Sequence, residues 1–565
     1  MKHLAFWCLF FPQLALASWP TRGHDNRRTG QAEEIGPAAV GRVETFKAQE
    51  GISINIAPTV GSDGSIYFGT WGVIRSYGEE DRHLWDKLDG KLYKLGMADL
   101  SQPWGGPFIP DGVPYCYDYA GRSDPGYCPT GGMVSWYNGT VEGTVALSED
   151  ETTLFMGRGD GKLYAVDTLT GGRRWVFTTF NPLDPSDPDG GGEIIGGPLR
   201  VSDGTLYFAT VKAGPYETNA LYAVDAQGQL LWRYPRDEAS LPHVVWASPS
   251  LSPDGKTVYF AASWGPSVDE RDPSIPGTVY AVDVSGPEPR LKWTFDPVDS
   301  SQGEPLNVWT YLTAVGSDGT LYLGGTRYSS SWGEAVVFAL HDGGDLAALV
   351  WPSFVEVDGD DAATVYGLAL REEQGITTHV LAGSGNGYGL TGYISGGELV
   401  SLDPGTGTLQ WAFDPTSAGE GGALTGISID GVGNIYSGAS GLGNDGGTVF
   451  SLDKSGKLRW TYNLGGLLEW GHPVIGPGGE VVVAETRRCF WYFQPIESGL
   501  CDGVDIDPAL YVIYPGEGGD DGGGCSTRGE GCGQTGKSRT STPVAGWGIL
   551  VVLVVRVQTR RQRRG

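Results

Sequence analysis

Side chains that could hold a metal ion are concentrated in two acidic loops of the sequence. The carboxylates are Asp184, Asp187 and Asp189 in the first loop and Asp358, Asp360 and Asp361 in the second. Clustered carboxylate oxygens are the ligands that Ca²⁺ prefers, so calcium is the metal that these loops predict. Neither loop matches the EF-hand pattern, and solvated loops without a metal are the alternative that we favour.

Other familiar catalytic patterns are missing from the sequence. The spacing defines no Ser-His-Asp trio, and there is no phosphate-cradling loop of the G-x-x-x-x-G-K type. The 7 histidines are few for a histidine-rich metal enzyme. These observations favour a binding or scaffold role over catalysis.

Short strands joined by tight turns must position these loops. The first half of a recurring unit is a strand, an Asp-Gly turn and a second strand, as in residues 58–69, 198–208, 249–260 and 314–322. Asp-Gly between alternating apolar residues is a strong local signal for a β-hairpin. With 91 glycines, 19 tryptophans and only 4 methionines, we expect almost no helix.

The second half of the unit is a strand, an Asp-containing turn with glycine, and a tryptophan. The tryptophans that follow this pattern are Trp175, Trp232, Trp293, Trp411 and Trp460. Aspartate caps such a turn with its carboxylate, and an indole has a large apolar face to place against a neighbouring sheet. We predict four strands per unit, with these tryptophans docking successive units.

The repeat resembles the tryptophan-docking repeat of pyrroloquinoline-quinone-type propellers, Ala-x-Asp-x-x-x-Gly-x-x-x-Trp, over about residues 19–501. The resemblance implies an all-β fold, an eight-bladed β-propeller of four-stranded antiparallel blades over residues 18–514. The units start near Pro58, Val145, Pro198, Pro249, Thr313, Leu368, Thr425 and Pro473. An orphan strand at residues 41–47 is expected to complete the last blade and close the ring, which would remove an unpaired edge.

In related quinoproteins the cofactor and a metal bind at the mouth of the central channel. The residues that could supply an aromatic floor, a carboxylate and an amide there are Glu142, Trp246, Asn307, Trp309 and Trp470. Such a site would hold pyrroloquinoline quinone with calcium and oxidise alcohols or sugars. Enzymes of the family also use a disulfide between adjacent cysteines, and this sequence has no Cys-Cys pair. We therefore expect no cofactor and keep the quinone-dependent dehydrogenase as the alternative.

Residues 71–140 are expected to form an insertion in the first blade. Its aromatic and charged side chains are Trp71, Arg75, Glu79, Asp81, Trp85, Trp104, Tyr115, Tyr117 and Trp136. Such side chains on a loop over a rigid scaffold suit recognition of a protein, peptide or glycan. The alternative is that they pack the loop onto its own blade.

The N-terminus reads as a secretory signal peptide over residues 1–17, with an apolar run and a small-x-small cleavage site. Without Cys8, which lies in that run, the 7 cysteines leave an even number for an oxidising compartment. Local disulfides between Cys116 and Cys128 and between Cys489 and Cys501 are the economical pairing.

The C-terminus is organised as a linker and a tail. Residues 515–542 are rich in glycine and acidic or polar side chains and contain Cys525, and residues 543–565 combine an apolar segment with an arginine cluster. This order resembles the MYXO-CTERM sorting tails of myxobacterial and related surface proteins. It implies attachment to the cell surface or outer membrane of a Gram-negative bacterium, with a periplasmic location or a plain membrane anchor as alternatives.

The formal net charge of −28 repels phosphate backbones and so argues against nucleic-acid partners. Taken with the repeats and the two ends, it predicts an exported, surface-anchored, non-catalytic propeller. Scaffold propellers of this repeat type, such as the outer-membrane assembly lipoprotein, bind partners through their loops.

Overall fold

The computed structural model describes most of the repeat region. The described residues are 19–48, 52–54, 57–72, 90–110, 116–117, 123–124, 141, 143–180, 192–194, 196–210, 219–236, 241, 248–262, 277–299, 306–328, 333–358, 364–385, 397–418, 424–440, 447–464, 466, 468, 471–485 and 509–516. The chain divides into two compact units, residues 1–526 and 527–565, and the second contains no described residue. The predicted signal peptide, linker and tail therefore lie outside the description, apart from residues 515 and 516.

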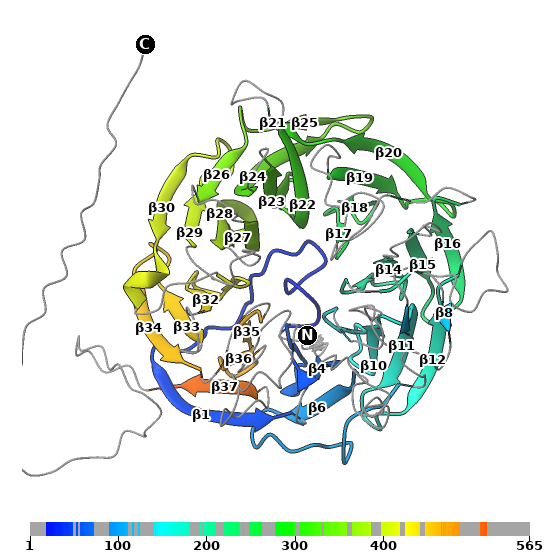
Figure 1. Cartoon of the computed structure of the whole chain (residues 1–565), viewed down its shortest axis with the longest axis vertical. Helices are drawn as coiled ribbons and strands as arrows, with labels where there is room; N and C mark the ends of the chain where they lie inside the picture. Colours follow the sequence, from blue (N-terminus) through cyan, green and yellow to red (C-terminus); the bar gives the residue numbers. More distant parts are fainter. Residues whose placement is uncertain are drawn as a thin grey trace, which may run out of the picture. The chain divides into compact units, whose positions relative to one another are not determined.

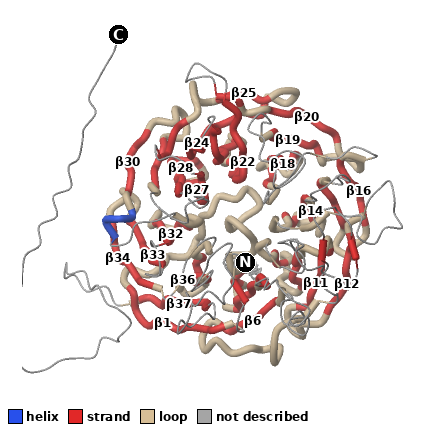
Figure 2. Tube along the Cα trace, in the orientation of Figure 1, coloured by secondary structure: helices blue, strands red, loops and turns tan. Residues whose placement is uncertain are grey.

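Nearly all regular structure is β-strand (Figure 2). Within the ranges above, the one helical segment is the short 3₁₀ helix η2 (Pro415–Ala418), as the composition predicts. In that part of the chain no helix is both long enough and apolar enough to cross a membrane.

Within residues 1–526 the strands form antiparallel sheets arranged in a ring about an axis (Figure 1). Five sheets consist of four consecutive strands: β9 (Ala146–Leu147), β10 (Thr153–Gly157), β11 (Lys162–Asp167) and β12 (Arg173–Thr178); β13 (Leu199–Arg200), β14 (Leu206–Ala209), β15 (Leu221–Val224) and β16 (Leu230–Tyr234); β17 (Ser250–Leu251), β18 (Thr257–Ala262), β19 (Thr278–Asp283) and β20 (Arg290–Phe295); β27 (Thr364–Glu373), β28 (Ile376–Gly385), β29 (Leu399–Leu402) and β30 (Leu409–Phe413); β31 (Ser428–Ile429), β32 (Ile435–Ser440), β33 (Gly447–Leu452) and β34 (Leu458–Asn463).

Three further sheets depart from this plan. They are the three-stranded sheet of β3 (Thr59–Val60), β4 (Ser65–Gly69) and β6 (Leu92–Gly96); the six-stranded sheet of β21 (Val298–Asp299), β22 (Leu306–Val315), β23 (Leu321–Tyr328), β24 (Gly333–Asp342), β25 (Ala347–Leu349) and β26 (Val355–Asp358); and the four-stranded sheet of β35 (Val474–Ile475), β36 (Val481–Ala484), β37 (Ala509–Pro515) and β1 (Val40–Lys47). Two small pairs are β2 (Ile52–Ser53) with β5 (Trp71–Gly72), and β7 (Cys116–Tyr117) with β8 (Ser123–Asp124).

The all-β propeller of four-stranded antiparallel blades is confirmed, but the predicted count is not. Six sheets have four strands, one has six, and the sheet of the first repeat has three. Among the described residues, seven sheets rather than eight therefore have four or more strands. The third strand of the first repeat, β6, lies inside the range predicted as an insertion, and beyond it only an isolated bridge joins Leu92 to Phe108.

The last sheet combines the two ends of the described chain. Strand β1 pairs antiparallel with β37, with Val43 opposite Ile513 and Lys47 opposite Ala509. Strand β37 in turn pairs with β36. The N-terminal strand thus lies at the outer edge of the sheet that contains the C-terminal strand. The sequence did not predict β37.

Tryptophans on outer strands contact the turn of the following sheet. Trp175 donates a hydrogen bond from Nε1 to the carbonyl oxygen of Ala226 at 2.9 Å, and its indole lies over Gly228, where a Cβ would come within 2.6 Å of the ring. Trp351 repeats this arrangement with Pro404 and Gly407, and Trp411 lies over Gly456 in the same way. Trp293 bonds to Asp342, Trp460 to the carbonyl oxygen of Pro37, and buried Trp232 packs with the apolar residues of β17 and β18.

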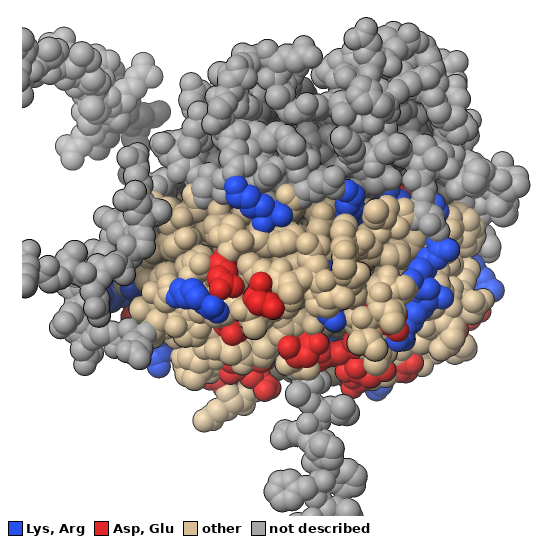
Figure 3. All heavy atoms as spheres, turned by 90° about the horizontal axis from the view of Figure 1, so that it is seen from below, with Lys and Arg blue, Asp and Glu red and all other residues tan. Residues whose placement is uncertain are grey.

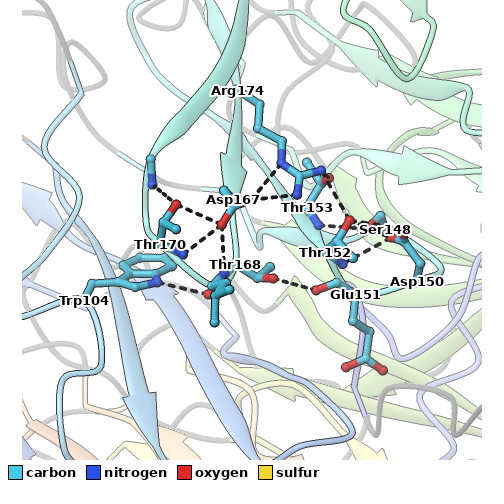
Figure 4. Close-up of polar contacts among 12 residues, drawn as sticks. Trp104, Ser148, Asp150, Glu151, Thr152, Thr153, Asp167, Thr168, Thr170 and Arg174 are labelled. Atoms are coloured by element: carbon cyan, nitrogen blue, oxygen red, sulfur yellow. Dashed lines mark hydrogen bonds and ion pairs between the residues drawn. The ribbon is translucent and has the colours of Figure 1, made fainter.

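Trp104 belongs to the same class, although its position suggested a recognition loop. Its Nε1 donates to the carbonyl oxygen of Thr168 at 3.0 Å, and the ring faces Gly171 in the turn of the next sheet (Figure 4). In that turn Asp167 accepts hydrogen bonds from Thr170 and from the guanidinium of Arg174. This tryptophan therefore joins two sheets, which is neither of the roles that the sequence suggested.

Two glycine-to-alanine substitutions can distinguish the energetic cost of disturbing a tryptophan–glycine contact from the cost of a left-handed backbone. Gly407 has φ +71°, and a Cβ there would lie 2.7 Å from the Trp351 ring, whereas Gly375 has φ +75° and open space around it. Both changes to alanine should cost about 1–2 kcal/mol for the left-handed backbone. Gly407→Ala should lose about 1–3 kcal/mol more, because the indole must move. Urea unfolding of both variants measures the difference, and equal losses would show that the indole contact contributes little.

Candidate functional site

The N-terminal residues of the described chain run through the centre of the ring. We call residues 19–37 the axial segment; it is the dark blue trace that crosses the middle of Figure 1, inside the short strands that begin the sheets. Its neighbours belong to many sheets rather than to one. The axis of the ring is therefore lined by this segment and by the first strands of the sheets.

Hydrogen bonds tie the axial segment to seven sheets in the order in which these sheets occur in the sequence. The contacts lie on or next to the first strand of each sheet, except in the six-stranded sheet, where the contact is on β22. The bonds are Trp19 N and O with Val60, Leu147 N to Pro20 O, Thr21 Oγ1 to Pro198 O, Leu251 N to Asn26 O, Val315 N to Arg27 O, Leu370 N to Thr29 O, and Ile429 N to Gly30 O. Most of these bonds are 2.7–3.0 Å long. The segment thus serves as a common hydrogen-bonding partner for seven sheets.

Side chains shape and fix the middle of the segment. Asp25 accepts hydrogen bonds from the backbone of Arg27 at 2.9 Å and from the hydroxyl of Thr29 at 2.8 Å, which closes a tight turn. Arg27 reaches out of the turn and makes a two-pronged ion pair with Glu372 of β27, at 2.6 and 2.8 Å. Paired bonds of this kind fix orientation as well as adding energy.

Positively charged and imidazole side chains gather inside the ring, in contrast to the acidic protein around them. Arg28 is 5% exposed. It donates from Nε to Pro249 O at 3.0 Å and from Nη1 to Thr21 Oγ1 and Arg22 O. Burial and the neighbouring charge of Arg22 lower its pKa to about 9, against a smaller opposing effect of Asp25.

His472, just before β35, is the second strongly perturbed group. It packs against Gly426, where a Cβ would overlap the imidazole. Burial, with repulsion by Arg22, lowers the pKa of His472 to about 3, so the folded protein holds this imidazole neutral. His24 lies edge-on to Trp19 with ring centroids 5.1 Å apart, and burial lowers its pKa too.

The neutral His472 predicts acid sensitivity. In the unfolded chain His472 has an ordinary pKa near 6.5, whereas in the folded protein its pKa is about 3. Between these two pH values only the unfolded chain binds the proton, so the free energy of unfolding falls as the pH drops through this range. The loss from this one group is at most about 1.4 kcal/mol per pH unit. Urea unfolding at pH 7.5, 6 and 5 should show a shallower decline for His472→Asn than for the wild type. Parallel declines would contradict the prediction.

A buried ion cluster lies in the six-stranded sheet. Arg327, with a side chain 2% exposed, bonds Asp299 at 2.6 Å, Glu334 at 2.8 Å and Glu356 at 3.0 Å. A guanidinium thus occupies the centre of three carboxylates. In the described ranges no group of three or more His, Cys, Asp or Glu side chains is arranged to hold a metal ion.

Few of the residues predicted for a cofactor or metal can be placed. Asn307 and Trp309 lie two positions apart on β22, and Asn307 is half-buried. Asp358 ends β26, and Cys116 begins β7. The others lie outside the described residues: Glu142, Trp246, Trp470, Asp184, Asp187, Asp189, Asp360, Asp361, Cys128, Cys489 and Cys501. One amide and one indole position do not define a quinone site, so no step of a reaction is derived through that cofactor.

Acidic turns surround the axial segment. The exposed aspartates that lead the hairpin turns are Asp63, Asp150, Asp203, Asp254 and Asp318. These turns directly follow the first strands that the axial segment contacts. Figure 3 shows red acidic side chains gathered along the lower side of the described surface, with basic side chains higher up. A shallow pocket opens there between Arg27 and the turn around Ser252.

The sheets and the repeats define a β-propeller fold. Residues 126–290 match the family model described as outer membrane protein assembly factor BamB, which confirms the repeat resemblance over this part of the chain. A search of curated protein sequences finds no match.

Solved structures support the fold. Quinohemoprotein alcohol dehydrogenase from Comamonas testosteroni matches with a TM-score of 0.53 and 13% identity, covering 90% of this chain and 82% of its own. Quinohemoprotein alcohol dehydrogenase ADHIIG from Pseudomonas putida HK5 gives 0.52 and 14%, covering 91% and 82%. A europium-containing methanol dehydrogenase gives 0.52 and 13%, covering 88% and 98%. At these identities the likeness concerns the fold alone.

Proposed function

We propose that this chain is an exported, non-catalytic β-propeller that acts as a scaffold for a protein partner. It would be anchored at the cell surface or outer membrane of a Gram-negative bacterium through its C-terminal tail, with a periplasmic location as the alternative. We propose that the two acidic loops do not bind calcium and that the partner is a protein rather than a nucleic acid. A peptide or glycan partner is the weaker form of the same idea.

The observation that carries the proposal is the axial segment. It bonds to successive sheets along the axis, where a quinone would need an open channel, and these bonds would stabilise the ring as a platform for a partner. The match of residues 126–290 to an outer membrane protein assembly factor supports a scaffold role. We further propose that the three-stranded sheet is an eighth blade whose fourth strand is reduced to the Leu92–Phe108 bridge, and that β1 closes the ring.

A quinone-dependent dehydrogenase is the second candidate, favoured by the fold shared with three quinoprotein enzymes. In that case pyrroloquinoline quinone and calcium, or a lanthanide, would bind near Asn307 and Trp309. The cofactor would accept hydride from an alcohol or sugar.

Cofactor uptake distinguishes the two functions. The purified full chain is titrated with pyrroloquinoline quinone in the presence of calcium or europium, uptake is followed by absorbance, and dye reduction is measured with alcohols and sugars. The scaffold proposal expects neither stoichiometric uptake nor turnover. Stoichiometric uptake with turnover would overturn it, and loss of both in Asn307→Ala, with retention in the exposed-site control Arg236→Met, would locate the cofactor at β22.

The proposed location has a separate test. Protease treatment of intact cells should digest the chain if it is at the surface, whereas an internal periplasmic protein should resist until the outer membrane is opened. Resistance in intact cells would contradict surface attachment without affecting the scaffold proposal.

A further inference from the structure

The inside of the ring holds a buried guanidinium whose hydrogen bonds are incomplete. Three of the Arg28 contacts are made by Nε and Nη1, all to neutral oxygens. Its Nη2 is buried and has no hydrogen-bonding partner. A buried charged group normally has a paired opposite charge, because desolvating a lone ion costs several kcal/mol.

Among the described residues, the hydrogen-bonding partners of Arg28 include no carboxylate. The Asp25 carboxylate accepts hydrogen bonds from the backbone of Arg27 and from Thr29, and Glu372 is committed to Arg27. Glu33 is exposed. The neighbouring charge with the largest effect on the pKa of Arg28 is a second cation, Arg22. The charge of Arg22 also lowers the pKa of His472.

Neighbouring groups add further polar atoms without hydrogen bonds. Trp19 Nε1 and His24 Nδ1 are also buried without hydrogen-bonding partners. His24 and Arg28 both adopt left-handed backbone conformations, with φ +70° and +62°. Non-glycine residues seldom do so, and such strain persists where the surrounding structure holds a side chain in a required direction. The turn closed by Asp25 thus holds both side chains inside the ring.

We propose that the interior of the ring binds a small oxoanion, with the guanidinium of Arg28 as its principal donor. A carboxylate, phosphate or sulfate group accepts hydrogen bonds from the edge of a guanidinium and neutralises its charge. The ligand would supply the negative charge that is missing among the described hydrogen-bonding partners of Arg28. This site is independent of the scaffold function and of any quinone.

Calorimetric titration of the full chain tests the site. Sodium sulfate, sodium phosphate and sodium acetate are added separately at constant ionic strength, with chloride as the balancing anion. We expect saturable binding, close to one per chain, of at least one of them, and the preferred probe shows whether the site suits a tetrahedral anion or a carboxylate. Absence of saturable binding by all three probes would overturn the proposal.

Two substitutions assign the binding to Arg28. Asparagine tolerates the left-handed backbone, so Arg28→Asn removes the donor without adding strain, and we expect affinity to fall at least tenfold. Arg28→Lys keeps the charge and should retain weaker binding. The control Arg236→Asn changes an arginine with a 71% exposed side chain and should bind like the wild type.

If Arg28→Asn does not fold, X-ray diffraction from wild-type crystals can test the site instead. Wild-type crystals soaked in selenate should show an anomalous peak within hydrogen-bonding distance of Arg28. Water alone at that position, or wild-type affinity in a folded Arg28→Asn protein, would overturn the assignment.

Discussion

Removal of the axial segment should abolish cooperative folding. A chain that begins at Ala38 keeps β1 but loses the bonds of the axial segment to seven sheets. Each such bond contributes about 1 kcal/mol, and the sum is comparable to the whole stability of an ordinary domain, about 5–15 kcal/mol. We expect the truncated protein to show no sharp thermal transition, whereas removal of residues 517–565 should leave the transition in place. Circular dichroism and calorimetry measure both.

A peptide sharpens this test. Residues 19–37 added in trans to the truncated protein should restore part of the transition, and a scrambled peptide of the same composition should not. A truncated protein that unfolds at the wild-type temperature would contradict the prediction and show that the sheets hold the ring without the axial segment.

Replacing the guanidinium at the centre of the buried ion cluster should have the next largest effect. Asp299 and Arg327 both have side chains that are 2% exposed and pair at 2.6 Å. Arg327→Met takes away the charge that neutralises Asp299, Glu334 and Glu356 together. Breaking a buried pair by removing one partner costs about 3–5 kcal/mol, because the remaining charge stays buried. Urea unfolding at neutral pH should show a loss of this size.

A double variant and an exposed pair serve as controls for the cluster. Arg327→Met with Asp299→Asn should recover part of the loss, since the most buried carboxylate is then neutral. Arg236→Met removes an exposed partner of Glu288 and should cost about 1 kcal/mol or less. If Arg327→Met cost no more than Arg236→Met, the cluster would be shown not to stabilise the fold.

The sequence predicted the hairpins and most of the docking tryptophans, because short sequence patterns determine both. Asp-Gly hairpins such as the one at Asp63 carry their own turn chemistry, and the Asp-turn-Trp pattern led to Trp175 and its counterparts. Trp104 and Trp351 make the same contacts but were missed as docking residues, because the turns before them depart from the repeat spacing. Strand β37 follows a long stretch without a repeat signal and was missed for that reason.

Long-range contacts limited the prediction of the site. The axial segment contains no periodic pattern, and each of its hydrogen bonds joins it to a different sheet, so nothing in residues 19–37 alone reveals the path. Likewise, His472 is neutral and Arg28 is incompletely bonded because both side chains are buried inside the ring. This burial exists only once the sheets have assembled, so the sequence alone does not reveal it. The residues proposed for a quinone were chosen by their place in the repeat, and of these Asn307 and Trp309 have a described position.

The ordered contacts of the axial segment also bear on how this chain can fold and diverge. Residues 19–37 cannot complete their hydrogen bonds until the sheets up to β31 have been synthesised, because these bonds reach as far along the chain as Ile429. Each contact position in the axial segment bonds one particular sheet. If recombination added or removed one repeat, every later position would face the wrong sheet, so the axial segment constrains the number of repeats.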